Sequence, residues 1–204
     1  MGMSTPTAPG PRRWTADEAR ALQDESRPWP RYECIDGALL VTPAPRPAHY
    51  YAQMALYERV RAYVHAQRLG EAYVPPTDVT LEPDTTVQPD LYVVPDWPPR
   101  RLRAWSDITT LLLAVEVLSP STARHDRLVK RRFYARMGVP EYWIVDTDTR
   151  LVERSYPDGR VAVVGDRLEW LPPGTTEPFV LELEQFFADA LGDDDMPNPE
   201  GELQ

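Results

Sequence analysis

The chain has 204 residues, of which 42% are hydrophobic and 26% charged, and it contains 23 prolines and a single cysteine. This composition is typical of one globular domain and excludes collagen-like, coiled-coil and disulfide-scaffold proteins. The longest apolar run, residues 111–118, is far shorter than the roughly 20 residues that cross a bilayer, and the N-terminal segment lacks the apolar core of a secretory signal. We therefore expect a cytoplasmic protein that does not span a membrane.

Charge is distributed unevenly along the chain, whose net charge is −10. Residues 188–204 include six acidic and no basic residues, so much of the negative charge belongs to the C-terminal segment. Residues 97–136, in contrast, include nine basic and three acidic residues. This basic segment indicates either a surface that attracts phosphate or the solvated face of a helix.

Hydrophobic periodicity and turn residues predict a succession of short elements. Thr15 and Glu18 form a capping-box pattern, Asp36-Gly37 is a hairpin turn signal, and Gly70 and Gly138 are expected to end helices. In chain order, the predicted elements are a helix at 14–23, strands at 32–35 and 38–42, a helix at 49–68, strands at 72–74, 79–81, 91–94 and 111–118, a helix at 122–137, strands at 141–146, 151–156, 161–164 and 168–170, and a helix at 183–191.

These elements predict one domain over residues 14–191, since no repeat or linker interrupts them. Residues 1–13 and 192–204 are too polar and too rich in Pro, Gly, Ser or Asp to order themselves, so we expect two disordered tails, the second acidic. The order strand, helix, strand over residues 111–146 predicts a crossover with a parallel strand pair. We therefore expect an α/β (α+β) fold, with a mixed sheet flanked by helices and additional short hairpins.

Two carboxylates stand at the ends of predicted strands. Glu116 interrupts the apolar run 111–118, where an unpaired charge is costly to bury. Asp90 follows Pro89 at the start of the apolar run 91–94. If these strands are neighbours, both carboxylates can reach one hard cation such as Mg²⁺. The alternative to a metal site is that Glu116 forms an ion pair with an arginine and has only a structural role.

Lys130 is the only lysine among the 22 basic residues of the chain. A solitary lysine in a sequence that otherwise uses arginine indicates a position that needs a compact ammonium. Asp126, Lys130, Phe133 and Tyr134 share one helical stripe, and the aromatic residues mark that stripe as core-facing. Lys130 is therefore predicted to point toward the sheet that carries Glu116, although a surface ion pair with Asp126 is the ordinary alternative.

These segments resemble the Uma family of restriction endonucleases, which belongs to the PD-(D/E)xK nuclease superfamily. The resemblance covers roughly residues 14–190 and is carried by RYECIDG (31–37), VQPDLYVV (87–94) and AVEVLSPSTARHDRLVKRRFYARMGVPEYWIVD (114–146). It implies a restriction-endonuclease-like fold. It also implies a metal-dependent endonuclease that hydrolyses the phosphodiester bonds of double-stranded DNA, and we expect a homodimer.

The resemblance further implies which residues form the site. The superfamily's metal-binding Asp and Glu correspond to Asp90 and Glu116, which would hold Mg²⁺, or Mn²⁺ in its place, together with the Val117 backbone carbonyl. The superfamily's lysine stands two residues after the Glu, where this chain has Leu118. Lys130 is then the candidate for a catalytic lysine that has moved to the following helix, where it would orient water or neutralise developing charge.

Further residues are expected near this site. Glu33 and His49 precede or begin the first long helix, and Glu33 is the stronger candidate for supporting the metal site; ordinary surface positions are the alternative. A groove lined by basic residues would favour DNA as substrate. The candidates for DNA contacts are Arg124, Arg127 and Arg131, with Arg100, Arg101 and Arg103 as further members of the basic segment.

Leu118 at the usual lysine position keeps two other functions open. The first is a nuclease-fold binding or interaction module with weak or no catalysis, which the net charge of −10 also favours. The second is a metal-dependent hydrolase of a phosphate substrate other than DNA, because a metal site alone does not select a substrate.

Overall fold

The computed structural model describes residues 12–23, 26–27, 29–96 and 102–192. The two predicted tails, residues 1–13 and 192–204, lie outside these ranges except for Arg12, Arg13 and Gly192. Within the described ranges, no helix is both long and apolar enough to cross a membrane.

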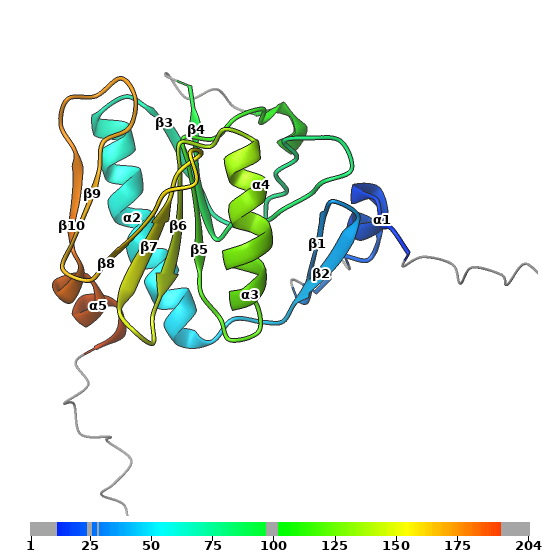
Figure 1. Ribbon diagram of the computed structural model, residues 1–204, viewed down its shortest axis with the longest axis horizontal. Helices are drawn as coiled ribbons and strands as arrows, with labels where there is room; N and C mark the ends of the chain where they lie inside the picture. The colour runs from blue at the N-terminus through cyan, green and yellow to red at the C-terminus, as the bar shows by residue number, and fades with distance from the viewer. Residues whose placement is uncertain (1–11, 24–25, 28, 97–101, 193–204) are drawn as a thin grey trace, which may run out of the picture.

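A mixed sheet of six strands lies at the centre of the described fold, in the order β3-β4-β5-β6-β7-β8 (Figure 1). Neighbouring strands are antiparallel except β5 and β6, which are parallel. The predicted mixed sheet with a parallel pair around the crossover is therefore confirmed. The strands are β3 (Gly70–Tyr73), β4 (Leu91–Pro95), β5 (Leu113–Val117), β6 (Glu141–Asp146), β7 (Leu151–Ser155) and β8 (Val161–Val164).

The crossover between β5 and β6 is helical, as predicted for residues 122–137, but it is not one uniform helix. It consists of α3 (Ala123–His125), a π-helical segment (Asp126–Lys130) and α4 (Arg131–Arg136). A π-helical turn holds more residues than an α-helical turn, so it changes which side chains share a face. Gly138 adopts a φ of 69°, the left-handed conformation that ends helices, as predicted.

The two faces of the sheet pack against different helices. Val115 and Val117 of β5 belong to one apolar cluster with the helices α2 and α5, whereas Ala114 packs in a second cluster with α4. Because side chains alternate along a strand, Glu116 shares the side of Ala114 and faces the crossover helix. The flanking helices outside the crossover are α2 (Pro47–Ala66) and α5 (Leu183–Leu191).

A separate hairpin stands beside the sheet, next to the N-terminal helix (Figure 1). Asp36 and Gly37 form its turn with φ values of 52° and 80°, as the sequence predicts. Backbone hydrogen bonds of 2.9 and 2.8 Å join Cys34 to Thr86, and they hold the hairpin against the segment that leads into β4. The elements are α1 (Ala16–Ala21), which has the predicted capping box, β1 (Arg31–Ile35) and β2 (Ala38–Thr42).

Gly70 does not end the long helix, so this prediction is wrong. Helix α2 ends at Ala66, and Arg68 already has a left-handed φ of 56°. Gly70 instead opens β3 with a φ of 155°, where a Cβ atom would lie 1.9 Å from the Val94 carbonyl oxygen. The glycine therefore permits close strand pairing.

Two short strand predictions also differ from the structure. The predicted strand at residues 79–81 is reduced to an isolated bridge between Val79 and Val87. Conversely, β10 (Phe179–Glu182) was not predicted; it pairs antiparallel with β9 (Arg167–Trp170). A run of four residues is too short for its alternating pattern to stand out in the sequence.

Candidate active site

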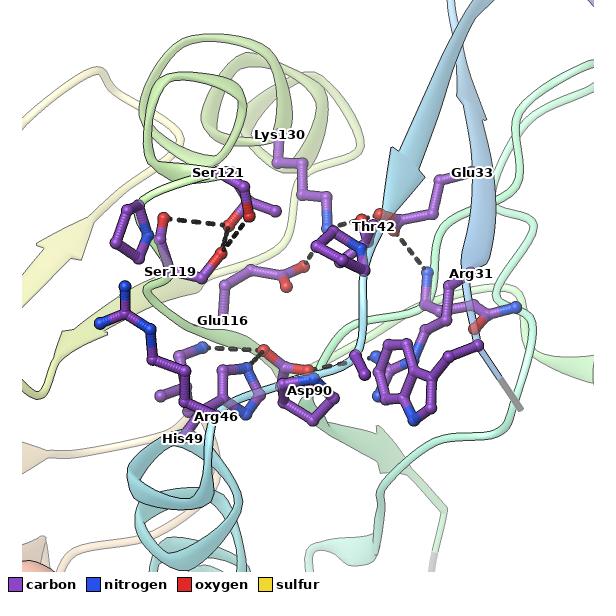
Figure 2. A pocket seen from close by; sticks show the side chains of 18 residues that line it. Arg31, Glu33, Thr42, Arg46, His49, Asp90, Glu116, Ser119, Ser121 and Lys130 are labelled. Atoms are coloured by element: carbon purple, nitrogen blue, oxygen red, sulfur yellow. Dashed lines mark hydrogen bonds and ion pairs between the residues drawn. The ribbon is translucent and has the colours of Figure 1, made fainter. Parts of the chain in front are cut away.

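A pocket lies where β5 ends and β4 begins. Its walls come from the β1–β2 hairpin, the first turn of α2, residues 119–122 and the π-helical segment. Figure 2 shows Lys130 reaching down toward Glu116 and Glu33, with Asp90 below them. The structure thus brings together four side chains that the sequence singles out from four separate segments, and Val117 also lines the pocket.

Asp90 is the most heavily hydrogen-bonded acid of this pocket. Its Oδ2 atom accepts a hydrogen bond of 2.9 Å from the Val117 backbone N–H and lies 2.9 Å from His49 Nε2, while Oδ1 lies 3.2 Å from the Arg31 guanidinium. Gln53 also donates to the Asp90 backbone carbonyl at 2.6 Å. Burial by itself would raise the pKa of Asp90, but His49, Arg31 and the Val117 N–H outweigh it and lower that pKa. Asp90 is therefore an ionised carboxylate.

Lys130 lies between two carboxylates. Its ammonium is 2.8 Å from Glu116 Oε1 and 2.9 Å from Glu33 Oε2, and the residue is only 2% exposed. The nearest Asp126 oxygen is 3.8 Å away. Glu116 thus pairs with the lysine and not with an arginine, and Lys130 is a buried residue of the pocket and not a surface partner of Asp126.

Glu33, Glu116 and Lys130 are each positioned by a different part of the fold. Glu33 comes from β1, where its Oε1 atom accepts a hydrogen bond of 2.8 Å from the Gln88 backbone N–H. Glu116 projects from β5 toward the crossover helix, and Lys130 is the last residue of the π-helical segment in that helix. The docking of the hairpin and the register of the crossover helix therefore decide whether the three side chains meet.

Around Lys130, buried acids outnumber buried lysine and arginine residues: Glu33, Asp90, Glu116 and Asp126 against Lys130 and Arg31. Burial raises the pKa of Glu116 well above its ordinary value; Lys130 opposes this shift, whereas Asp90, Asp126 and Glu33 add to it. Burial likewise raises the pKa of Asp126 to about 6. Burial lowers the pKa of Lys130, but the surrounding carboxylates reverse this effect and raise it well above the ordinary lysine value. Lys130 and Arg31 together cannot neutralise all four acids, so the site favours an added cation or proton.

The donor atoms fit a hard divalent cation. The described residues contain no group of three or more His, Cys, Asp or Glu side chains arranged to hold a metal ion. A cation here would therefore depend on the carboxylates of Asp90 and Glu116, a backbone carbonyl and water. Mg²⁺ is commonly bound in this way, and Mn²⁺ accepts the same oxygen ligands. The excess of negative charge is the structural observation that favours such an ion.

The Val117 carbonyl is a suitable third donor. In a strand, the N–H and C=O of one residue point to the same side, so this carbonyl points to the side where the Val117 N–H meets Asp90. The register Leu91 to Val115 would continue with Pro89 opposite Val117. Proline has no N–H to donate, so β4 offers no backbone partner to this carbonyl.

The predicted DNA-contacting arginines are not part of the pocket lining. Arg127 pairs with Glu153 at 2.6 Å, and Arg131 pairs with the same carboxylate on β7. Arg124 and Arg103 are exposed, whereas Arg100 and Arg101 lie outside the described residues. The role of this basic segment in DNA binding stays a prediction.

Two other arginines line the pocket and were not predicted from the sequence. Arg31 contacts Asp90, and Arg46 precedes the first turn of α2 at the edge of the pocket (Figure 2). Arg31 stands two residues before Glu33, so the two-residue period of a strand could have placed both on one face. No comparable local signal pointed to Arg46. His49 is confirmed beside the site through its contact with Asp90.

Comparisons with known proteins bear on the family and the fold of this chain. A family model described as "Uma2: Putative restriction endonuclease" matches residues 16–186. Among solved structures, a crystal structure described as a putative nuclease belonging to DUF820 from Anabaena variabilis ATCC 29413 is similar to this chain. The TM-score is 0.66 and the sequence identity 21%, and the match covers 87% of this chain and 99% of that chain. No curated protein matches. The structural similarity confirms the predicted nuclease-like fold.

Proposed function

The chain belongs to the Uma2 family, and we propose that it hydrolyses DNA phosphodiester bonds with a divalent cation held by Asp90, Glu116 and the Val117 carbonyl. Family membership supports a nuclease. The single observation that carries the proposed site is the buried Lys130 ammonium between Glu116 and Glu33, beside Asp90. Mg²⁺ is the proposed cation, with Mn²⁺ as a substitute.

The bound cation would polarise the scissile phosphate and lower the pKa of an attacking water. The two proposed ligands differ in how the protein prepares them. The hydrogen bonds to Asp90 hold its carboxylate ionised and fixed in position. Glu116 has Lys130 as its ion-pair partner, and its raised pKa means that it gains from a nearby positive charge.

Lys130 supplies a positive charge that does not depend on the cation. In hydrolysis, a water molecule gives up a proton to the surrounding solvent as its oxygen bonds to phosphorus, the bond from phosphorus to the leaving oxygen breaks, and the leaving oxygen takes up a proton from solvent. The raised pKa of Lys130 keeps it protonated, so it acts by stabilising negative charge and donating hydrogen bonds, not by removing a proton. Glu33 holds the ammonium from the side opposite Glu116 and is a positioning residue.

Plasmid cleavage tests this proposal. Supercoiled DNA is incubated with the protein and Mg²⁺ or Mn²⁺, and nicked and linear products are quantified. We expect Glu116→Gln to lower the rate by roughly 100-fold or more. Glu141→Gln is the matched control, because Glu141 is also buried and ion-paired, with Arg154 at 2.9 Å, but lies outside the pocket. Comparable losses in both variants would indicate a general effect of buried charge and contradict the proposed site.

The same assay separates the alternative functions. Cleavage that persists after chelation of divalent cations would overturn the metal-dependent mechanism. DNA binding without cleavage would instead favour a binding module with a nuclease fold. That the protein forms a homodimer stays a prediction. Light scattering tests it by measuring the molar mass in solution.

A further inference from the structure

A second cavity lies beside the catalytic pocket and shares part of its wall. Trp29, Arg31 and Pro45 line both spaces. On the far side, the second cavity, called here the lateral cavity, is lined by Tyr50, Met54, Val74, Pro75 and Pro76. The two spaces therefore adjoin at Trp29, Arg31 and Pro45.

Arg31 links the two spaces physically. The centre of its guanidinium lies 4.0 Å from the centroid of the Trp29 ring, in a cation–π contact, and the same group is 3.2 Å from Asp90. Arg31 is buried, so its position is set by these partners. Trp29 is half-buried and is thus held as a fixed wall between the proposed phosphate site and the lateral cavity.

The lining of the lateral cavity differs in chemistry from that of the catalytic pocket. Among the described residues, no carboxylate lines it; its polar members are Arg31 and Gln53. The Gln53 amide nitrogen already donates to the Asp90 carbonyl. Tyr50 is 53% exposed, so its aromatic ring is accessible to a ligand in this cavity. This lining suits a flat, largely apolar group that is attached to an anion.

We propose that the lateral cavity binds one unpaired nucleobase next to the scissile phosphate. The inference rests on the proposed nuclease function and adds the form of DNA that the site accepts. In a polynucleotide, each base is joined to its phosphate through one sugar, so one nucleotide can fill two adjoining sites. Aromatic side chains such as Trp29 and Tyr50 bind bases by stacking. A paired base is not free to enter, so the substrate must be single-stranded or have a base turned out of the duplex.

The test measures binding without cleavage, in the Glu116→Gln background. Fluorescence anisotropy at fixed salt compares a short oligothymidylate with an abasic oligomer of the same length, which keeps every phosphate but lacks the bases. We expect the oligothymidylate to bind roughly 5- to 150-fold more tightly, the range for stacking of one base. A fully paired duplex of the same length should bind more weakly than the oligothymidylate.

Variants of the lateral cavity then test where the bases bind. Trp29→Ala and Tyr50→Ala should each remove most of the preference for the oligothymidylate over the abasic oligomer, whereas Trp29→Phe should retain that preference. Tyr50 is the decisive position, because no contact joins it to Arg31 among the described residues, so its loss leaves the Arg31–Asp90 pair in place. Trp105→Ala is the matched control, since Trp105 is 41% exposed and packs on Tyr73 away from both cavities.

The outcomes distinguish this inference from the proposed function. Equal binding of the two oligomers would overturn the base site, and so would a preference that survives both Trp29→Ala and Tyr50→Ala. If the wild type still cleaves plasmid in that case, the nuclease function stands alone. A base preference that depends on Trp29 and Tyr50, in a protein that cleaves no DNA, would support the base site and overturn the nuclease.

Discussion

The ammonium of Lys130 lies 2.8 Å from the Glu116 carboxylate, although the two residues come from a strand and from the helix that follows it. A lysine two residues after Glu116 would reach the pocket from the same strand. Here the crossover helix brings its lysine back over the strand end, and its π-helical segment ends at that lysine. The positive charge of the site is therefore coupled to the packing of the helix on the sheet.

Replacing Lys130 by arginine tests whether the site needs an ammonium. We expect Lys130→Arg to lose most nuclease activity, roughly 100-fold, because a planar guanidinium does not fit the space between Glu116 and Glu33 in the same way. Plasmid-nicking rates measure the effect, and circular dichroism confirms folding. Arg132→Lys is the control, because Arg132 lies in α4 of the same crossover but is exposed and outside the pocket lining. A fully active Lys130→Arg variant would refute the role given to Lys130.

Divalent cations should stabilise the protein through Asp90. Because like charges crowd the pocket, Mg²⁺ or Mn²⁺ binding should raise the thermal midpoint of the wild type. Asp90→Asn should abolish most of this rise, whereas Asp158→Asn, on an exposed hairpin, should keep it. Thermal scans with and without the cation measure the difference within each variant. The same rise in Asp90→Asn as in the wild type would place the cation elsewhere.

The buried carboxyl of Asp126 should make stability depend on pH. Its pKa is raised from 3.8 to about 6 in the folded protein, so folding favours the protonated form. The stability that this proton contributes is fully present below about pH 4 and is lost as the pH rises through about 6. The Asn side chain of Asp126→Asn stays neutral at every pH. Relative to the wild type, the free energy of unfolding of this variant should therefore rise by about 3 kcal/mol as the pH increases from about 4 to 7. Urea unfolding across this range measures the gain, and a pH-independent difference would contradict the prediction.

A lysine at position 118 should partly replace Lys130. Leu118 lies two residues after Glu116, and it packs on the cluster that includes α4, so its side chain approaches the same side of the sheet. Lys130→Met should be inactive and less stable than the wild type, because Glu116 and Glu33 lose the ammonium with which both of them pair. Adding Leu118→Lys should restore measurable nicking, whereas adding Leu118→Met should not. Equal activity of the two double variants would show that position 118 does not reach the site.

The sequence by itself determined most of the framework and the central acids and base. Apolar periodicity predicted the buried strands around Glu116, and the order of strand, helix and strand predicted the parallel pair. The burial of Asp90, Glu116 and Lys130 could be inferred because each is a polar residue within a local pattern that marks a core-facing position. Such signals extend over a few residues, which is the range over which helix and strand periodicity operates.

Only the tertiary structure decided how the site is completed. Arg31 and His49 meet at Asp90 from positions 59 and 41 residues away, and the docking of the β1–β2 hairpin brings Glu33 to Lys130. The structure also showed that Glu153 engages Arg127 and Arg131, which charge alone had marked for DNA. These contacts depend on how separate elements pack, on a π-helical segment and on one-residue choices of register. Local periodicity carries no information about which distant side chain will occupy the neighbouring space, so these partners emerge only when the chain is folded.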